Sequence, residues 1–250
     1  MSQRRILRVS GADAAAFLQN LVTNDVDAVA NGLVYAALLT PQGKFLVDFF
    51  MLSDADGILL DVAEDFADGL QQRLAMYKLR AAVEIAAVDL FVHRGVGDAP
   101  ADGFADPRSA AMGWRAYRTQ PPGPDVVDWT ALRVREAIPE TGVELTPDTF
   151  ILEAGFERLN GVDFRKGCYV GQEIVARMKH KTTLRKGLVT VEVAGAAPVG
   201  TAITANGKAA GILLSQAGDQ AIAYLRFDRI TETMTAGDAT VSMPAVQEIG

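Results

Sequence analysis

Apolar residues in the first ninety positions gather in short runs that turn residues separate. The runs LVYAALLT (33–40) and FLVDFFML (45–52) flank the turn sequence PQGK. Both are partly β-branched or aromatic, so together they predict a β-hairpin. ILLDV (58–62) follows another turn and predicts a third strand, and AVEIAAV (82–88) predicts a fourth.

Two segments in the same region have sequence patterns typical of helices. Ser10-Gly11-Ala12-Asp13 precedes an alanine-rich run that ends near Asn20, which predicts a short capped helix. Between 64 and 78, apolar side chains including Tyr77 recur at near-helical spacing and predict an amphipathic helix. Helices and strands that alternate irregularly, with a meander among them, favour an α+β fold over a doubly wound parallel sheet.

The sequence pattern changes along the second half of the chain. Residues 95–128 are rich in Gly, Pro and Asp, and we expect loops there with one strand near 113–118. Thr146-Pro147-Asp148 resembles a helix start. From Gly187 onward, short β-type runs alternate with Gly, Asn or Asp, which predicts a small β-barrel or sandwich. We therefore divide the chain into residues 1–183, an α+β region, and 184–250, a β-barrel domain.

Composition narrows the class of protein and its expected compartment. Apolar residues make up 49% of the 250 positions and charged residues 22%, as in an ordinary globular protein. A single cysteine excludes an intrachain disulfide, so we expect a cytosolic location. The first residues contain no apolar core of a signal peptide, and no run of about 20 apolar residues predicts a membrane span.

Charge is distributed unevenly along the chain. The net charge is −7, yet the segment from Arg158 to Lys186 has eight cations and two acids. This basic segment indicates a local anion site, or alternatively a solvated helix face with cations near the helix end. Because aromatic residues are not interleaved with these cations, we do not expect a nucleic-acid partner.

The only cysteine lies inside the basic segment, in RKGCYVGQEIVARMKHK (165–181). Cations near Cys168 favour the reactive thiolate, and the glycines at 167 and 171 allow a ligand to approach the backbone closely. A helix is predicted to begin near Gly171, so the thiol should lie on the preceding loop. The alternative is a small buried cysteine without chemistry. Neither His93 nor His180 has metal-ligand spacing to Cys168, so no metal site is expected.

The octapeptide KGCYVGQE (166–173) resembles the K-G-C-[YF]-x-G-Q-E signature of the folate-binding YgfZ family. FLQNLVTNDV (17–26), LLTPQGKFLVDFF (38–50), YKLRAAVEI (77–85) and LEAGFERLNGVDF (152–164) are similar to stretches of that family or of the glycine-cleavage T-protein, an aminomethyltransferase. The resemblance implies a T-protein-like ring of α+β units around a folate-binding hole, followed by a small C-terminal β-barrel. It also implies tetrahydrofolate as the cofactor.

The resemblance carries specific residues into the expected site. Asp48 corresponds to one of two adjacent acids in T-proteins; the other position here is Val47. Glu153 corresponds to a glutamate that contacts the pterin, and both acids are expected to line one cavity. The alternative for Asp48 is a solvent-facing strand position, and for Tyr77 a core position. Cys168 is the expected functional thiol, and the expected folate contacts are Asp48, Tyr77, Arg80, Glu153, Lys166, Gln172, Glu173 and Arg177.

The resemblance implies a tetrahydrofolate-binding protein that supports the maturation or repair of iron–sulfur enzymes. The expected partners are folate, whose polyglutamate tail suits the basic segment, and iron–sulfur client or assembly proteins. An alternative is a folate-dependent one-carbon transferase, such as an aminomethyltransferase or a demethylase, which would not need Cys168. A third hypothesis is a binding module without folate.

Overall fold

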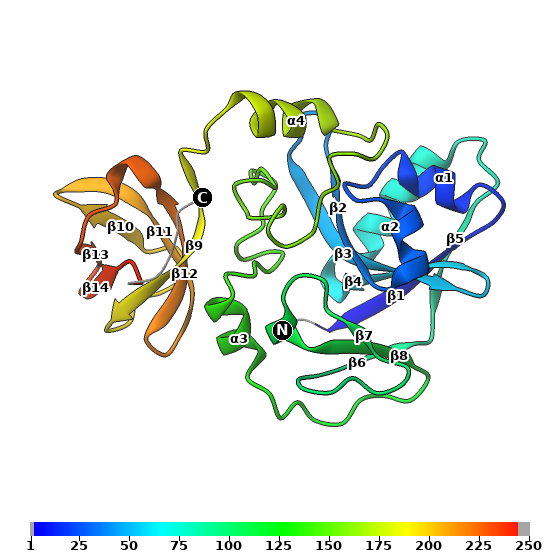
Figure 1. Cartoon of the computed structure of the whole chain (residues 1–250), viewed down its shortest axis with the longest axis horizontal. Helices are drawn as coiled ribbons and strands as arrows, with labels where there is room; N and C mark the ends of the chain where they lie inside the picture. The colour runs from blue at the N-terminus through cyan, green and yellow to red at the C-terminus, as the bar shows by residue number, and fades with distance from the viewer. Residues whose placement is uncertain (1–2, 245–250) are drawn as a thin grey trace. The chain divides into compact units, whose positions relative to one another are not determined.

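The computed structural model describes residues 3–244, and the chain in it divides into two compact units (Figure 1). The first unit runs up to Val127 and also contains Phe156–Ala176. The second unit contains Asp128–Gly155 and continues from Arg177. The chain therefore passes between the units three times, which no local sequence pattern indicated.

A five-stranded antiparallel sheet forms the centre of the first unit. Its order is β2-β3-β4-β1-β5, and every neighbouring pair is antiparallel. The predicted hairpin and the two further predicted strands are confirmed, whereas β1 was not predicted. The strands are β1 (Arg4–Ser10), β2 (Val34–Leu39), β3 (Phe45–Asp54), β4 (Gly57–Ala63) and β5 (Glu84–Val88).

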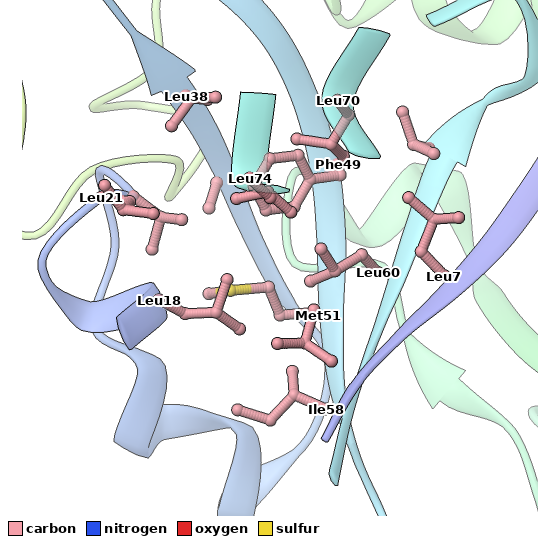
Figure 2. Close-up of a cluster of buried hydrophobic side chains, with 14 of the residues drawn as sticks. Leu7, Leu18, Leu21, Leu38, Phe49, Met51, Ile58, Leu60, Leu70 and Leu74 are labelled. Carbon is pink, nitrogen blue, oxygen red and sulfur yellow. The ribbon is translucent and has the colours of Figure 1, made fainter. Parts of the chain in front are cut away.

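Two helices contribute apolar side chains to one face of this sheet. They are α1 (Ala14–Gln19) and α2 (Glu64–Lys78), and both were predicted. Leu18 of α1 and Leu70 and Leu74 of α2 join strand residues such as Phe49 and Leu60 in one buried cluster (Figure 2). A 3-10 helix, η1 (Val26–Asn31), follows α1. Because alternate residues of a strand face opposite ways, the side chains between the cluster residues of β3 belong to the other face.

A second, three-stranded sheet occupies the region predicted to be mostly loops. Its strands are β6 (Phe91–Gly95), β7 (Phe104–Ala105) and β8 (Trp114–Arg118), in the order β6-β8-β7, with the 3-10 helix η2 (Ala110–Met112) between β7 and β8. The strand expected near 113–118 is confirmed, and the other two were missed. A Cβ on Gly95 would lie 2.6 Å from the indole of Trp114, so the ring packs directly on the Gly95 backbone and leaves no space for a side chain there.

The helix predicted to start at Thr146 does not form. The backbone N–H of Thr146 donates to the side-chain hydroxyl of Thr149 (2.9 Å), which closes a turn in place of the first helical hydrogen bond. Successive turns follow over 151–160, interrupted by positive φ at Gly155 (77°) and Asn160 (52°). The helix predicted near Gly171 is confirmed as α4 (Gln172–Lys181).

The second unit is built on a closed antiparallel β-barrel, as predicted. Its order is β10-β11-β12-β9-β14-β13. A helix that was not predicted, α3 (Trp129–Arg135), belongs to the same unit, and its buried Arg133 donates to Glu144 (3.1 Å) and to Ser215 of β11. The strands and a short 3-10 helix are β9 (Lys186–Ala194), β10 (Ala202–Ala205), β11 (Lys208–Ala217), β12 (Gln220–Arg226), η3 (Phe227–Arg229), β13 (Met234–Ala236) and β14 (Ala239–Ser242).

The α+β class with a C-terminal barrel is therefore confirmed. The barrel begins at Lys186, while residues 128–155 group with it rather than with the sheets. The division into folding domains at residues 183 and 184 stays a prediction. Among residues 3–244, no helix combines the length and the hydropathy needed to cross a membrane.

Candidate functional site

Cys168 lies exposed on the loop that leads into α4. The loop runs from Arg165 to Gly171 and has no regular secondary structure. The backbone N–H groups of Arg165 and Lys166 both donate to the side chain of Asp163 (2.6 and 3.3 Å), which fixes the entry to the loop. The placement expected for the thiol is confirmed, and the alternative of a buried cysteine is wrong.

Lys166 anchors this loop from inside the protein. Its ammonium donates to the carbonyl oxygens of Gln19 (2.9 Å), Val22 (2.6 Å) and Asn24 (2.9 Å), at the end of α1 and just after it. Burial lowers the pKa of Lys166 to about 8, although Asp25 and Asp163 oppose the shift. An ammonium has three N–H donors, and here all three are used. We therefore infer that Lys166 positions the loop, and its predicted folate contact would require one of these bonds to break.

Close packing fixes the other end of the loop. Gly171 has φ of +86°, and a Cβ there would lie 2.6 Å from the carbonyl oxygen of Thr40 in the hairpin turn. The turn glycine, Gly43, is equally constrained, since its Cβ would lie 2.8 Å from Ile174 at the start of α4. By contrast, a Cβ on Gly167 would meet nothing within 4 Å. The fold therefore requires glycine at 171 and leaves open space beside the thiol at 167.

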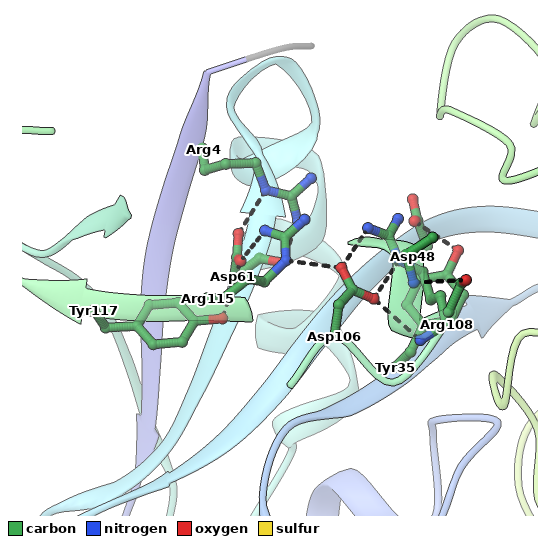
Figure 3. A network of polar contacts seen from close by, with 10 residues as sticks. Arg4, Tyr35, Asp48, Asp61, Asp106, Arg108, Arg115 and Tyr117 are labelled. Atoms are coloured by element: carbon green, nitrogen blue, oxygen red, sulfur yellow. Dashed lines mark hydrogen bonds and ion pairs between the residues drawn. The ribbon is translucent and has the colours of Figure 1, made fainter. Parts of the chain in front are cut away.

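Asp48 lies in a buried polar network on the sheet face opposite the cluster of Figure 2 (Figure 3). Its side chain is buried and accepts a hydrogen bond from the hydroxyl of Tyr35 (2.8 Å). Burial raises the pKa of Tyr35 well above its usual value, and the charge of Asp48 adds to the effect. The guanidinium of Arg108 lies 5.5 Å from the Tyr35 ring. The alternative of a solvent-facing Asp48 is therefore wrong.

The network continues through ion pairs between the two sheets of the first unit. Arg108 and Arg115 both donate to Asp106 (2.8 and 3.3 Å), and Arg115 reaches Asp61 (2.9 Å), which also pairs with Arg4 (2.5 Å). Burial alone would raise the pKa of Asp106, but the two arginines outweigh it and lower the pKa to about 2. Sequence analysis missed these residues. The one available signal was Asp61, a charge inside the apolar run ILLDV.

Glu153 belongs to a separate polar cluster in the second unit. It is 9% exposed, and its Oε2 accepts a hydrogen bond from the hydroxyl of Tyr224 in β12 (2.6 Å). The ammonium of Lys186 lies 3.8 Å from the same oxygen and 5.2 Å from the Tyr224 ring. Burial raises the pKa of Tyr224, and the bond to Glu153 raises it further. Tyr224 was not predicted as a site residue, and Lys186 was included only as the last cation of the basic segment.

The remaining predicted residues lie on α2 and α4 or just after α2. Tyr77 packs against the cluster of Figure 2 and also lines an open hollow of about 320 Å³ between the end of α2 and α1. Because it occupies the sheet face opposite Asp48, the two do not form one local pocket. Arg80 is exposed just after α2, Gln172 opens α4 and donates weakly to the Gly167 carbonyl (3.4 Å), and Glu173 and Arg177 are exposed one turn apart.

Relatives of known identity decide the family. Over 273 residues, the chain is 32% identical to the human protein named iron–sulfur cluster assembly factor IBA57, mitochondrial, covering 91% of this chain and 76% of that protein. The chain belongs to the IBA57 family of iron–sulfur cluster assembly factors. An IBA57 homologue from Pyricularia oryzae is 30% identical, covering 97% of this chain and 75% of that protein. The expected membership of a YgfZ-like group of assembly proteins is therefore confirmed.

Two further comparisons concern the architecture of this IBA57-family chain. Residues 185–247 match the model of the CAF17 C-terminal β-barrel domain. The crystal structure of glycine cleavage system aminomethyltransferase T from Bartonella henselae superposes with a TM-score of 0.75, at 15% identity, over 98% of this chain and 84% of that one. At this identity the likeness concerns the fold, and it confirms the T-protein-like architecture.

The comparisons also correct one expectation. The cytosolic location expected from the single cysteine is contradicted, because the curated IBA57 relatives are named as mitochondrial proteins. The reasoning failed because a lone cysteine excludes only an intrachain disulfide, and the cytosol is not the only compartment that keeps thiols reduced.

Proposed function

We propose that this IBA57-family protein acts in iron–sulfur cluster assembly through Cys168, which supplies one thiolate ligand to a cluster in transit. The observation that carries the proposal is the exposed thiol on a loop anchored at both ends, by the buried ammonium of Lys166 and by the tightly packed Gly171. A thiolate is the ligand that iron–sulfur clusters take from proteins. A rigid loop keeps that ligand in a fixed place at small entropic cost on binding.

The cluster is cargo in this proposal, and its other ligands come from elsewhere. Within residues 3–244, no three His, Cys, Asp or Glu side chains gather in an arrangement suited to a metal ion. A [2Fe–2S] or [4Fe–4S] cluster usually takes four protein ligands, so one thiol does not hold it alone. The remaining ligands then belong to a partner protein, and the cluster bridges the two chains.

The test replaces Cys168 with alanine or serine in cells that lack the native protein. Because the side chain is exposed, the free energy of unfolding of both variants should lie within about 0.5 kcal/mol of the wild-type value. Iron–sulfur enzyme activity should nevertheless fall to the level of cells without the protein. Thr183→Ala, an exposed change beyond α4, is the matched control and should keep full activity. Full activity of Cys168→Ala would end the proposal.

We also propose that the protein binds tetrahydrofolate, with Glu153 as the pterin contact. Tyr224 occupies Oε2 of Glu153, while Oε1 has no hydrogen-bond partner among residues 3–244, so this oxygen is available to the N–H donors of a pterin. A charged acceptor makes the stronger bond, so Glu153→Gln should weaken binding. The measurement is calorimetric titration with tetrahydrofolate. Unchanged affinity would remove Glu153 from the site.

The folate tail gives a second, independent test of the same proposal. Exposed cations of the basic segment, among them Arg165, Arg177 and Arg185, suit an anionic polyglutamate chain. Folates with longer tails should bind more tightly, and added salt should reduce the gain. Equal affinity for monoglutamate and polyglutamate forms would contradict the assignment. The predicted contacts Asp48, Gln172 and Glu173 are then tested by single alanine variants in the same titration.

The one-carbon transferase remains the alternative activity. It is disfavoured because β3 presents the single acid Asp48 beside the buried Val47, where T-proteins have two acids. The two activities separate on the thiol, since transfer of a one-carbon unit from folate does not need Cys168. Transfer activity that survives Cys168→Ala would establish the alternative.

A further inference from the structure

An exposed leucine in a strained backbone conformation ends α2. Leu79 is 88% exposed, with φ of 43° and ψ of −104°. The N–H of Ala81 donates to the carbonyl of Lys78 (2.8 Å), so Leu79 is the first central residue of a tight turn. These angles are close to those of a type II′ turn, in which glycine dominates that position. The fold gains no apolar burial from this leucine and would accommodate glycine with less strain.

Further apolar surface lies close to Leu79 along the chain, where Tyr77 and Ala81, two residues before and after it, line a hollow. Met76, three residues earlier on α2, is 61% exposed. The open hollow, of about 320 Å³, is completed by Phe17 of α1 and by Asn20 directly after that helix. Together Met76, Leu79 and this hollow are called the α2-end surface. A protruding leucine beside a concave apolar hollow is the kind of feature that anchors a partner protein.

The charges at this surface indicate whether its partner is acidic or basic. Lys78 and Arg80 flank Leu79, and among residues 3–244 neither side chain forms an ion pair. The one acid in the lining of the hollow, Asp13, already accepts a hydrogen bond from the N–H of Ala82 (2.7 Å), so the local balance is positive. The chain as a whole has a net charge of −7, so two unpaired cations beside an exposed leucine stand out against their background. Acidic residues on a partner would complement them and steer the encounter.

The α2-end surface is continuous with the loop that carries the thiol. Asn20, which lines the hollow, accepts a hydrogen bond from the N–H of Val170 (3.3 Å), and Val170 packs on the same side of the sheet as Tyr77. Cys168 is two residues from Val170, a span of at most about 7 Å. A stable interface covers about 800 Å² on each partner. A partner that binds at Cys168 can therefore extend onto the hollow by way of Val170 and Asn20.

We propose that the α2-end surface docks an acidic partner protein that inserts an apolar side chain into the hollow and packs against Leu79, and thereby brings its own cluster ligands to Cys168. This inference rests on the proposed function, because it names the surface that binds the partner of Cys168. It gives Tyr77 and Arg80 a role other than the folate contact that the sequence resemblance implied. A protein is favoured over a lipid surface because the hollow is concave and adjoins the loop of the thiol.

The first test separates docking from stability by the direction of each effect. Leu79→Gly should melt at or above the wild-type temperature, because it relieves a positive φ. The same variant should lose most of its support of iron–sulfur enzymes in cells lacking the native protein, since docking weakens roughly tenfold without one buried leucine. Val126→Gly removes a side chain that is 93% exposed on another segment and should keep full support. Wild-type support by Leu79→Gly would overturn the proposal.

Charge reversal gives a second variant in case Leu79→Gly does not fold. Arg80→Glu should lower iron–sulfur enzyme activity, whereas Lys208→Glu, at an exposed cation of β11, should not. Equal effects of the two changes would overturn the acidic partner. Vesicles of one-third phosphatidylserine test the lipid alternative: if wild-type protein sediments with them and Leu79→Gly does not, the surface binds membrane and the proposal is wrong.

Overproduction beside the wild type distinguishes failure of docking from failure of the thiol. Cys168→Ser still docks, so in excess it should occupy the partner and lower iron–sulfur enzyme activity. The double variant Cys168→Ser with Leu79→Gly should not inhibit. If Cys168→Ser alone supports full activity, the proposed role of the thiol falls, and the result for Leu79→Gly still decides docking. Equal inhibition by the single and double variants would overturn docking while leaving the thiol in place.

Discussion

Replacing Lys166 with methionine should release the thiol loop while leaving the thiol in place. Methionine keeps much of the apolar stem but removes the three hydrogen bonds to the carbonyls of Gln19, Val22 and Asn24. Hydrogen bonds from a charged group contribute about 1.5–3 kcal/mol each, so roughly 4–9 kcal/mol is lost. Several kcal/mol is regained because an ammonium no longer has to be buried. We expect a net destabilisation of about 2–4 kcal/mol.

The assay is thermal unfolding together with hydrogen exchange of the amides in the thiol loop. For a chain of this size, about 2–4 kcal/mol lowers the melting temperature by roughly 4–16 °C. Amide protection at Val170 should fall, and iron–sulfur enzyme support should fall with it although Cys168 is present. Arg165→Met is the matched control, because its side chain is 95% exposed one position earlier. If Lys166→Met melts at the same temperature as Arg165→Met, the ammonium does not hold the loop and the reasoning is refuted.

Three further outcomes follow from the geometry. The pKa of Asp106 is lowered from 3.8 to about 2, so its carboxylate stabilises the fold by about 2 kcal/mol above pH 4, and this stabilisation is lost as the pH falls through 2. Asp106→Asn should remove that part of the acid dependence of unfolding measured by circular dichroism. Gly171→Ala should cost about 1–3 kcal/mol in denaturant melts, since its φ is +86°, whereas Gly167→Ala should stay within about 0.5 kcal/mol. Tyr224→Phe should weaken tetrahydrofolate about fivefold in titrations by freeing the Glu153 carboxylate, and an unchanged affinity would show that this bond does not orient the acid.

Local patterns predicted those elements whose signals lie within one segment. The hairpin of β2 and β3 follows from two apolar runs around a turn, and α2 follows from a helical repeat with matching ends. β1 was missed because its arginines interrupt the apolar pattern. Arg4 and Arg8 find their partners on other segments, at Asp61 and Asp54. Their charges are compatible with a strand only once those partners are in place.

The candidate site was less accessible from the sequence because its determinants are nonlocal. Lys166 read as a free cation beside a thiol, yet its acceptors lie 142 to 147 positions earlier in the chain. Glu153 was found only through resemblance, and its partner Tyr224 lies 71 positions away. Leu79 carried no signal at all, since an exposed leucine is recognised only when burial and φ are known.

The anchoring of the thiol loop has a consequence for how the protein is made. The carbonyls at the end of α1 are synthesised well before Lys166, which follows Val22 by 144 positions. At about 5–20 residues per second, a ribosome needs roughly 7–30 s to cover that distance. During this interval the N-terminal segment has neither its anchor nor the thiol. The thiol of Cys168 is thus synthesised only after the part of the first unit that ends at Val127, so the proposed cluster ligand is absent while that part can begin to fold.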